Sequence, residues 1–251
     1  MELTLLGTGT TSPVQDRTPA CYFLSMAGQR FLLDPGPGAL NRMVKAGISP
    51  FNLDSIILTH HHLDHSADLF FYLFSYKNCF KGEKRDVKIV APVGFSKVFD
   101  TLMQVYGDWI LSCDYQIKID EVSEAEWAVP GMTIKSLPML HGANAVGYRF
   151  EADGGPVFSY SGDTGYCDNL IALAGSADVL LVECSFPDDM EMEGHMTPSG
   201  VARAGIRSQV KKIVLTHFYP EIDTSKIADT MRSAGYNGNI VVGEDGMVIK
   251  L

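Results

Sequence analysis

Short apolar segments alternate with amphipathic ones along the chain, and glycine or proline separates most of them. Runs of apolar, β-branched and aromatic residues predict strands, whereas apolar positions three and four apart predict helices. The predicted strands are residues 3–7, 21–26, 30–34, 55–60, 132–139, 145–152, 156–164, 178–186 and 211–218. The predicted helices are residues 38–47, 67–77, 168–176, 197–209 and 224–235, and the aromatic-rich helix 67–77 is expected to face the core.

Strands outnumber helices, and helices occur in both halves of the chain. Such a pattern is typical of an α+β protein in which helices cover the outer faces of two stacked sheets. No repeat of fixed period and no low-complexity linker divides the sequence. We therefore expect one domain over residues 1–251.

Composition indicates an ordinary globular protein, with 251 residues, 46% hydrophobic and 20% charged. No apolar run approaches the roughly 20 residues of a membrane span. The N-terminal segment "MELTLLGTGTTSP" resembles a first strand and not a signal peptide. The five cysteines contain no C-x-x-C pair, which argues against disulfides and a zinc ribbon. A reduced, cytoplasmic protein without a membrane partner is expected.

The formal net charge of -10 argues against a broad nucleic-acid-binding surface. Only "KGEKRDVK" at residues 81–88 is locally basic, and it is expected to form a solvated turn before a strand. A nucleic-acid partner is therefore not expected.

The segment "THHHLDH", residues 59–65, contains four of the seven histidines of the chain. Imidazolium groups this close together would repel one another unless a bound cation kept them neutral. In an extended segment His60 and His62 lie on one face, whereas Asp64 and His65 follow after a turn and point elsewhere. Ligands offered in two directions fit two ions better than one, and zinc accepts both imidazole and carboxylate.

His141, Asp163 and His217 each close a predicted strand further along the chain. Together with "THHHLDH", this order of residues resembles the metallo-β-lactamase superfamily of hydrolases over essentially the whole chain. The resemblance implies a four-layer αββα sandwich in which His60, His62 and His141 hold one metal and Asp64, His65 and His217 hold the other. Asp163 would bridge both metals, and His61 would not be a ligand. Two zinc ions are expected, with manganese or iron as alternatives.

Two ions about 3.5 to 4 Å apart would share a bridging water and present hydroxide to an electrophile, which is hydrolysis. Asp64 is expected to be catalytic as well as a ligand. Asp34, in "LLDPGPG", has two open interpretations. It either accepts a hydrogen bond from a ligand histidine or only caps the turn.

The segment "EGHMTPSGVARAGI", residues 193–206, contains the remaining histidine, His195. Thr197 and Pro198 predict the start of a helix, and Glu183 is placed to accept a hydrogen bond from His195. These segments and "LTLLGTGTTSP" resemble the ribonuclease Z and cyclic-nucleotide phosphodiesterase branch, in which the corresponding pair is a catalytic dyad. The alternative is a buried strand-end carboxylate beside a capping-loop histidine.

The expected activity is hydrolysis of a small phosphodiester. Ribonuclease Z relatives carry a long basic arm that grips tRNA, and residues 151–195 contain no segment of that kind. Ribonuclease Z-like RNA processing therefore stays an alternative, beside a thioesterase or lactonase and a non-catalytic carrier. Relatives commonly dimerise, so a homodimer is also left open.

Overall fold

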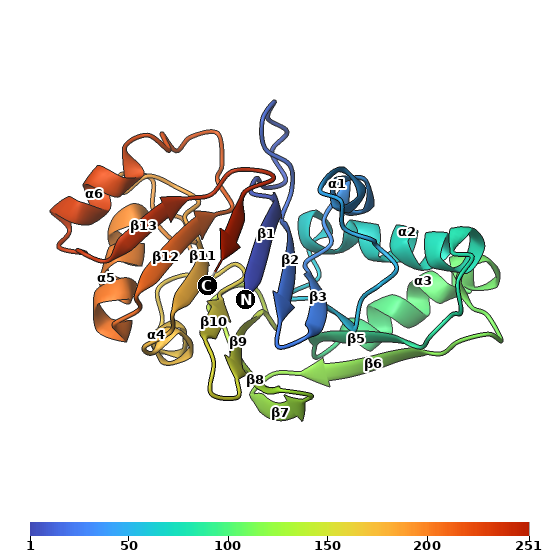
Figure 1. Ribbon diagram of the computed structural model, residues 1–251. Helices are drawn as coiled ribbons and strands as arrows, with labels where there is room; N and C mark the ends of the chain where they lie inside the picture. The colour runs from blue at the N-terminus through green and yellow to red at the C-terminus, as the bar shows by residue number, and fades with distance from the viewer. Residues whose placement is uncertain (251) are drawn as a thin grey trace.

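Two seven-stranded sheets lie face to face at the centre of the protein, with helices on both outer sides (Figure 1). The computed structural model describes residues 1–250. In spatial order the first sheet contains β14 (Val248–Lys250), β1 (Glu2–Gly7), β2 (Cys21–Met26), β3 (Gln29–Leu33), β4 (Ser55–Ile57), β5 (Val87–Pro92) and β6 (Ile117–Val122). The second contains β13 (Asn239–Val242), β12 (Lys212–Thr216), β11 (Val179–Glu183), β10 (Val157–Tyr160), β9 (Val146–Ala152), β8 (Met132–Pro138) and β7 (Ala125–Val129).

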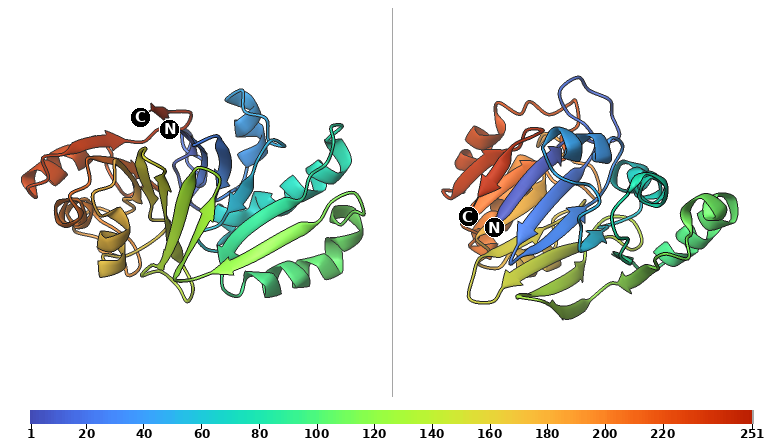
Figure 2. Two further views of the ribbon diagram at one scale, coloured as in Figure 1. Left: turned by 60° about the horizontal axis from the view of Figure 1, so that its bottom comes forward. Right: turned by 45° about the vertical axis from the view of Figure 1, so that its right-hand side comes forward.

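Three helices cover each sheet. The first sheet carries α1 (Ala39–Lys45), α2 (Leu63–Cys79) and α3 (Phe95–Ile110), and the second carries α4 (Asp168–Ala174), α5 (Pro198–Ser208) and α6 (Ile227–Ser233). Figure 2 shows the two helical layers on opposite sides of the paired sheets. The fold is therefore α+β, and the four-layer αββα arrangement expected from the sequence is confirmed.

Three apolar clusters fill the spaces between these four layers. The cluster between the sheets combines side chains from both halves of the chain, including Tyr22 and Phe31 from the first sheet and Tyr148 and Phe158 from the second. The other two clusters lie between each sheet and its own helices. Strands covered on both faces, such as β1, β2 and β11, are nearly continuously buried, whereas β6 and β7 at the sheet edges alternate between less and more exposed residues.

The direction of the strands brings the loops of interest to one edge of the sandwich. Strands β3 to β6 are parallel, and so are β10 to β13. Strand β8 runs in the same direction as β10 because both pair antiparallel with β9. The segments that follow β4, β8, β10, β11 and β12 carry the candidate residues. In open parallel sheets, binding sites form at such carboxyl ends.

The structure corrects three expectations drawn from the sequence. Helix α2 begins at Leu63, so Asp64 and His65 lie in its first turn and not after a separate turn. The same helix is not wholly core-facing, because Phe71 and Phe74 are 53% and 41% exposed. Helix α3 was missed, although its apolar residues follow a helical spacing. None of the helices in residues 1–250 is long and apolar enough to cross a membrane.

Candidate metal centre

Seven side chains predicted as metal ligands meet at the edge where the strands end. Their ligand atoms form three overlapping groups, in each of which all atoms lie within 4.8 Å of one another. The groups are His60, His62 and His141; His60, His65 and Asp163; and Asp64, His65 and His217. His61 belongs to no such group and is exposed, as expected for the variable position of the motif.

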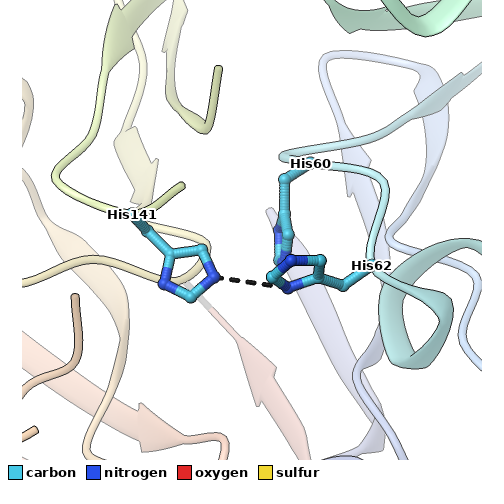
Figure 3. A group of neighbouring side chains, drawn as sticks. All are labelled: His60, His62 and His141. Atoms are coloured by element: carbon cyan, nitrogen blue, oxygen red, sulfur yellow. Dashed lines mark hydrogen bonds between the residues drawn. The ribbon is translucent and has the colours of Figure 1, made fainter. Parts of the chain in front are cut away.

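Three histidines form one end of the centre (Figure 3). His60 and His62 leave the loop after β4, and His141 approaches from the loop after β8 in the other sheet. His141 Nε2 lies 3.3 Å from His62 Nδ1, and the rings of His60 and His62 are 4.5 Å apart. Both halves of the chain therefore contribute to this group.

The other end is formed by the first turn of α2 and the loop after β12. His65 Nε2 lies 3.2 Å from His217 Nε2, and Asp64 Oδ2 lies 3.6 Å from the same His217 nitrogen. Asp64 and His65 are consecutive in the helix, so α2 fixes their relative positions.

Asp163 lies between the two ends. Its Oδ2 is 3.8 Å from His60 Nε2 and 3.9 Å from His141 Nε2. On the other side it is 3.5 Å from His217 Nε2, and its Oδ1 is 3.4 Å from His65 Nε2. Burial opposes ionisation of Asp163, but the nearby His217 and His65 outweigh it and hold the pKa of this carboxyl well below its usual range. One carboxylate therefore contacts nitrogens of both groups.

Hydrogen bonds on the outer side of two imidazoles turn their other nitrogens toward the centre. His65 donates from Nδ1 to Asp34 Oδ2 at 2.9 Å, and His141 donates from Nδ1 to the carbonyl of Gly194 at 2.9 Å. An acceptor at Nδ1 fixes a proton there and directs Nε2 of each ring toward the centre. Burial lowers the pKa of His65, but the nearby Asp163 and Asp34 outweigh it and raise the pKa well above its usual value. His60 Nε2 is buried without any hydrogen-bond partner in the described chain, and burial, then His65, holds the pKa of His60 well below its usual value. Imidazoles arranged around carboxylates form a donor set that fits metal ions.

Asp34 supports the candidate metal centre through its hydrogen bond with His65. It is fully buried, and it accepts hydrogen bonds from the Thr59 amide at 2.7 Å and the Tyr160 hydroxyl at 2.6 Å as well as from His65. Of the two interpretations of Asp34 left open by the sequence, the structure supports a contact with a candidate ligand. Thr59 and Tyr160 could not be recognised from the sequence, because neither residue type nor spacing marks them.

His195 lies beside the centre and is oriented by Glu183. Its Nδ1 is 3.0 and 3.1 Å from the two carboxylate oxygens of Glu183, which also accept from the amides of Thr164 and Met196. Burial lowers the pKa of His195, but the hydrogen bond to Glu183 outweighs this effect and raises it. The ring lies 4.9 Å from that of His141. The expected Glu183–His195 contact is therefore present.

The start of α5 holds the His195 loop in place. Thr197 is the N-cap, Pro198 is the first helical residue, and the Thr197 side chain accepts from the Gly200 amide. The predicted helix start is confirmed. His195 also lies within 4.8 Å of candidate ligand atoms of His141 and Asp163, so it is close enough to act on a group bound there.

Two further residues border the centre and were not predicted. Ser185 donates to Glu183, and its Oγ lies 3.0 Å from His217 Nδ1, which joins the dyad to the candidate ligands. Tyr219 is half-buried beside His195 and His217, and burial, then Asp64, raises its pKa to about 12. A serine and a tyrosine near strand ends carry no distinctive sequence signal.

The comparisons with known proteins agree with this geometry. Residues 29–218 match the family described as Beta-lactamase superfamily domain. A protein named Ribonuclease Z from Mycobacterium bovis is 29% identical over 98% of this chain and 96% of its own length. The metallo-beta-lactamase fold protein YhfI from Bacillus subtilis has a TM-score of 0.86 and 21% identity, covering 99% of both chains. The short form of human tRNase Z has a TM-score of 0.79 and 22% identity, covering 100% of this chain and 99% of its own.

The two structural neighbours share the fold, and the family match covers most of the chain, including the strand ends that carry the clustered histidines and aspartates. The chain therefore belongs to the metallo-β-lactamase superfamily and is a metal-dependent hydrolase.

Proposed function

We propose that this hydrolase is a phosphodiesterase acting on a small phosphodiester through two metal ions. The single observation that carries the proposal is the Glu183–His195 pair beside the metal centre. With Nδ1 directed at Glu183, His195 is left with Nε2 to face a substrate. Cleaving a phosphodiester expels an alkoxide, and an oriented imidazolium is suited to protonate it.

Each residue of the centre has a defined place in this proposal. His60, His62 and His141 would hold one ion, Asp64, His65 and His217 the other, and Asp163 would contact both. When bound, such ions lower the pKa of water and polarise a phosphoryl oxygen. Asp64 would help to place the attacking oxygen, Glu183 would keep the proton on the Nδ1 of His195, and His195 would donate its second proton to the leaving group. Zinc suits the imidazole-rich donor set, with manganese or iron as alternatives.

A small substrate is favoured by the charge of the loop that leads to His195. Between β11 and α5 this loop carries Asp188, Asp189, Glu191 and Glu193, and no lysine or arginine. A polyanion gains affinity from basic side chains along its backbone, and this loop would repel it. A substrate with a single phosphodiester avoids most of that repulsion.

The second candidate is ribonuclease Z-like processing of RNA. It is favoured by the similarity to Ribonuclease Z of M. bovis, which extends over 96% of that protein. The two candidates share the metal centre and the dyad, so they differ in substrate size alone. Turnover of a precursor tRNA at a higher kcat/KM than any small phosphodiester would favour the second.

The test combines metal analysis with hydrolysis of bis(p-nitrophenyl) phosphate, a thioester and a lactone. We expect His195→Ala to lower phosphodiester turnover by roughly a hundredfold to ten-thousandfold, the usual contribution of general acid catalysis. Its metal content should equal that of the wild type. His61→Ala is the matched control, because it removes a histidine of the same segment that belongs to no ligand group.

Two results would reject the proposal. One is wild-type protein that contains metal but hydrolyses only the thioester or the lactone. The other is phosphodiester turnover that does not change when His195 is replaced, because the dyad would then have no part in the reaction. A cytoplasmic location, a homodimer and a single domain stay predictions; gel filtration and an unfolding curve would test the last two.

A further inference from the structure

Tyr219 is fixed beside the metal centre by the same two loops that carry the candidate catalytic groups. It lies two residues after His217, and its amide donates to the carbonyl of Ser185 at 3.4 Å. Its ring stacks on the buried ring of Phe186, with centroids 4.6 Å apart and an angle of 21° between the planes. A tyrosine held in this way is placed with little rotational freedom before any ligand binds.

The ring of Tyr219 borders both the dyad and the candidate ligands. It meets His195 edge-on at 6.0 Å and His217 edge-on at 5.8 Å. It therefore borders His195 and one end of the candidate metal centre at the same time.

The hydroxyl of Tyr219 has no hydrogen-bond partner within residues 1–250, in contrast to two tyrosines of the cluster between the sheets. Tyr148 donates to the Leu58 carbonyl, and Tyr160 donates to Asp34. The Tyr219 hydroxyl is not enclosed by the protein, so it can reach a ligand or water. A phenol has an ordinary pKa of about 10, so the free hydroxyl of Tyr219 is a donor at neutral pH.

We propose that Tyr219 binds the substrate, with its hydroxyl donating a hydrogen bond to a non-bridging oxygen of the scissile phosphoryl group. This inference rests on the proposed phosphodiesterase function. Negative charge on these oxygens must be stabilised during phosphoryl transfer, and a donor fixed in advance does so without reorganisation. His195 would donate a proton to the leaving oxygen, and Tyr219 would donate a hydrogen bond to a non-bridging oxygen.

The test is Tyr219→Phe, which removes the hydroxyl and keeps the ring that stacks on Phe186. We expect kcat for bis(p-nitrophenyl) phosphate to fall about a hundredfold, as when one charge-stabilising donor is lost, with a smaller change in KM. Calorimetric titration with inorganic phosphate should give a several-fold weaker Kd. Metal content and Tm should equal those of the wild type.

Tyr106→Phe is the matched control. Tyr106 lies on α3, is 41% exposed, and its hydroxyl likewise has no partner among the described residues. This variant should keep wild-type turnover and phosphate affinity.

The outcomes separate the two proposals. If the wild type is active and the kcat of Tyr219→Phe lies within twofold of the wild-type value, the role of Tyr219 is overturned. The proposed phosphodiesterase function then stays intact. Loss of metal or a lower Tm in Tyr219→Phe would also overturn it, because the hydroxyl would then support the structure and not the substrate. Wild type that contains metal but hydrolyses no phosphodiester would overturn both.

Discussion

Asp34 orients one of the candidate metal ligands, His65. Its buried carboxylate joins His65 to Thr59 and Tyr160, and so connects the first sheet to the second. A carboxylate that accepts a hydrogen bond from the Nδ1–H of a ligand histidine fixes the ring and makes its other nitrogen a better ligand. Its backbone has a φ of 47°, a left-handed conformation that aspartate tolerates better than most residues.

We predict that Asp34→Asn weakens metal binding by about tenfold to a hundredfold, the usual cost of losing such a partner. The amide keeps the volume but loses the negative charge that His65 faces. Competition with a chromophoric chelator measures the change. Asp54→Asn is the control, because Asp54 is an exposed aspartate whose carboxylate accepts from the Arg30 amide and contacts no candidate ligand, and it should keep wild-type affinity.

The backbone before Asp163 requires a glycine, and Gly162 occupies that position. Its φ is 57°, and a Cβ built there would lie 2.5 Å from the Cβ of Thr59. The Asp163 loop can therefore approach the loop of His60 only with glycine at this position.

Gly162→Ala should lower the free energy of unfolding by roughly 2 to 6 kcal/mol, because backbone strain and overpacking add. Gly154→Ala measures the backbone strain without overpacking, because the φ of Gly154 is 64° and nothing lies within 4 Å of the added Cβ. Urea unfolding of both variants measures the difference. Equal destabilisation would contradict a close contact between the two loops.

At the scale of elements, helix α5 is held at its start by Asp188 as well as by its own N-cap. The Asp188 carboxylate accepts from the Ser199 amide at 3.0 Å and from its hydroxyl at 2.5 Å. Burial raises the pKa of Asp188, but the hydrogen bonds from Ser199 outweigh it and lower the pKa. A group whose pKa is lowered by folding stabilises the protein above its unfolded pKa, about 3.9 for aspartate, and loses this effect as pH falls through the folded value.

We predict that Asp188→Asn is less stable than wild type at pH 6 and that the difference shrinks at pH 3. Urea unfolding at the two pH values tests this directly. Asp189→Asn is the control, because Asp189 forms no hydrogen bond or ion pair among the described residues, and it should not change the pH dependence. A difference between Asp188→Asn and wild type that grows toward pH 3 would contradict the assignment.

Helix α2 shows what sequence reasoning missed. The spacing in "THHHLDH" predicted that the ligands point in two directions. It did not predict where the helix begins, because a histidine-rich segment lacks the regularly spaced apolar residues that mark a helix. The exposed Phe71 and Phe74 were wrongly expected in the core, because aromatic density does not say which side of a helix a sheet covers.

At the scale of the molecule, the sequence predicted the sandwich and the meeting of residues separated by more than 150 positions, such as His60 and His217. Buried strands indicated stacked sheets covered by helices, and the resemblance of the ordered ligand residues to the metallo-β-lactamase superfamily implied the four layers and the meeting of the ligands. The hydrogen bonds of Thr59, Tyr160 and Ser185 left no such pattern, because they arise only when loops from the two sheets approach.

The central claim is that two metal ions bind these seven side chains, and anomalous diffraction at the absorption edge of the bound metal tests it most directly. We predict two peaks, one among His60, His62 and His141 and one among Asp64, His65 and His217, with Asp163 contacting both. A single peak, or an ion ligated by His195 and Glu183, would contradict the account.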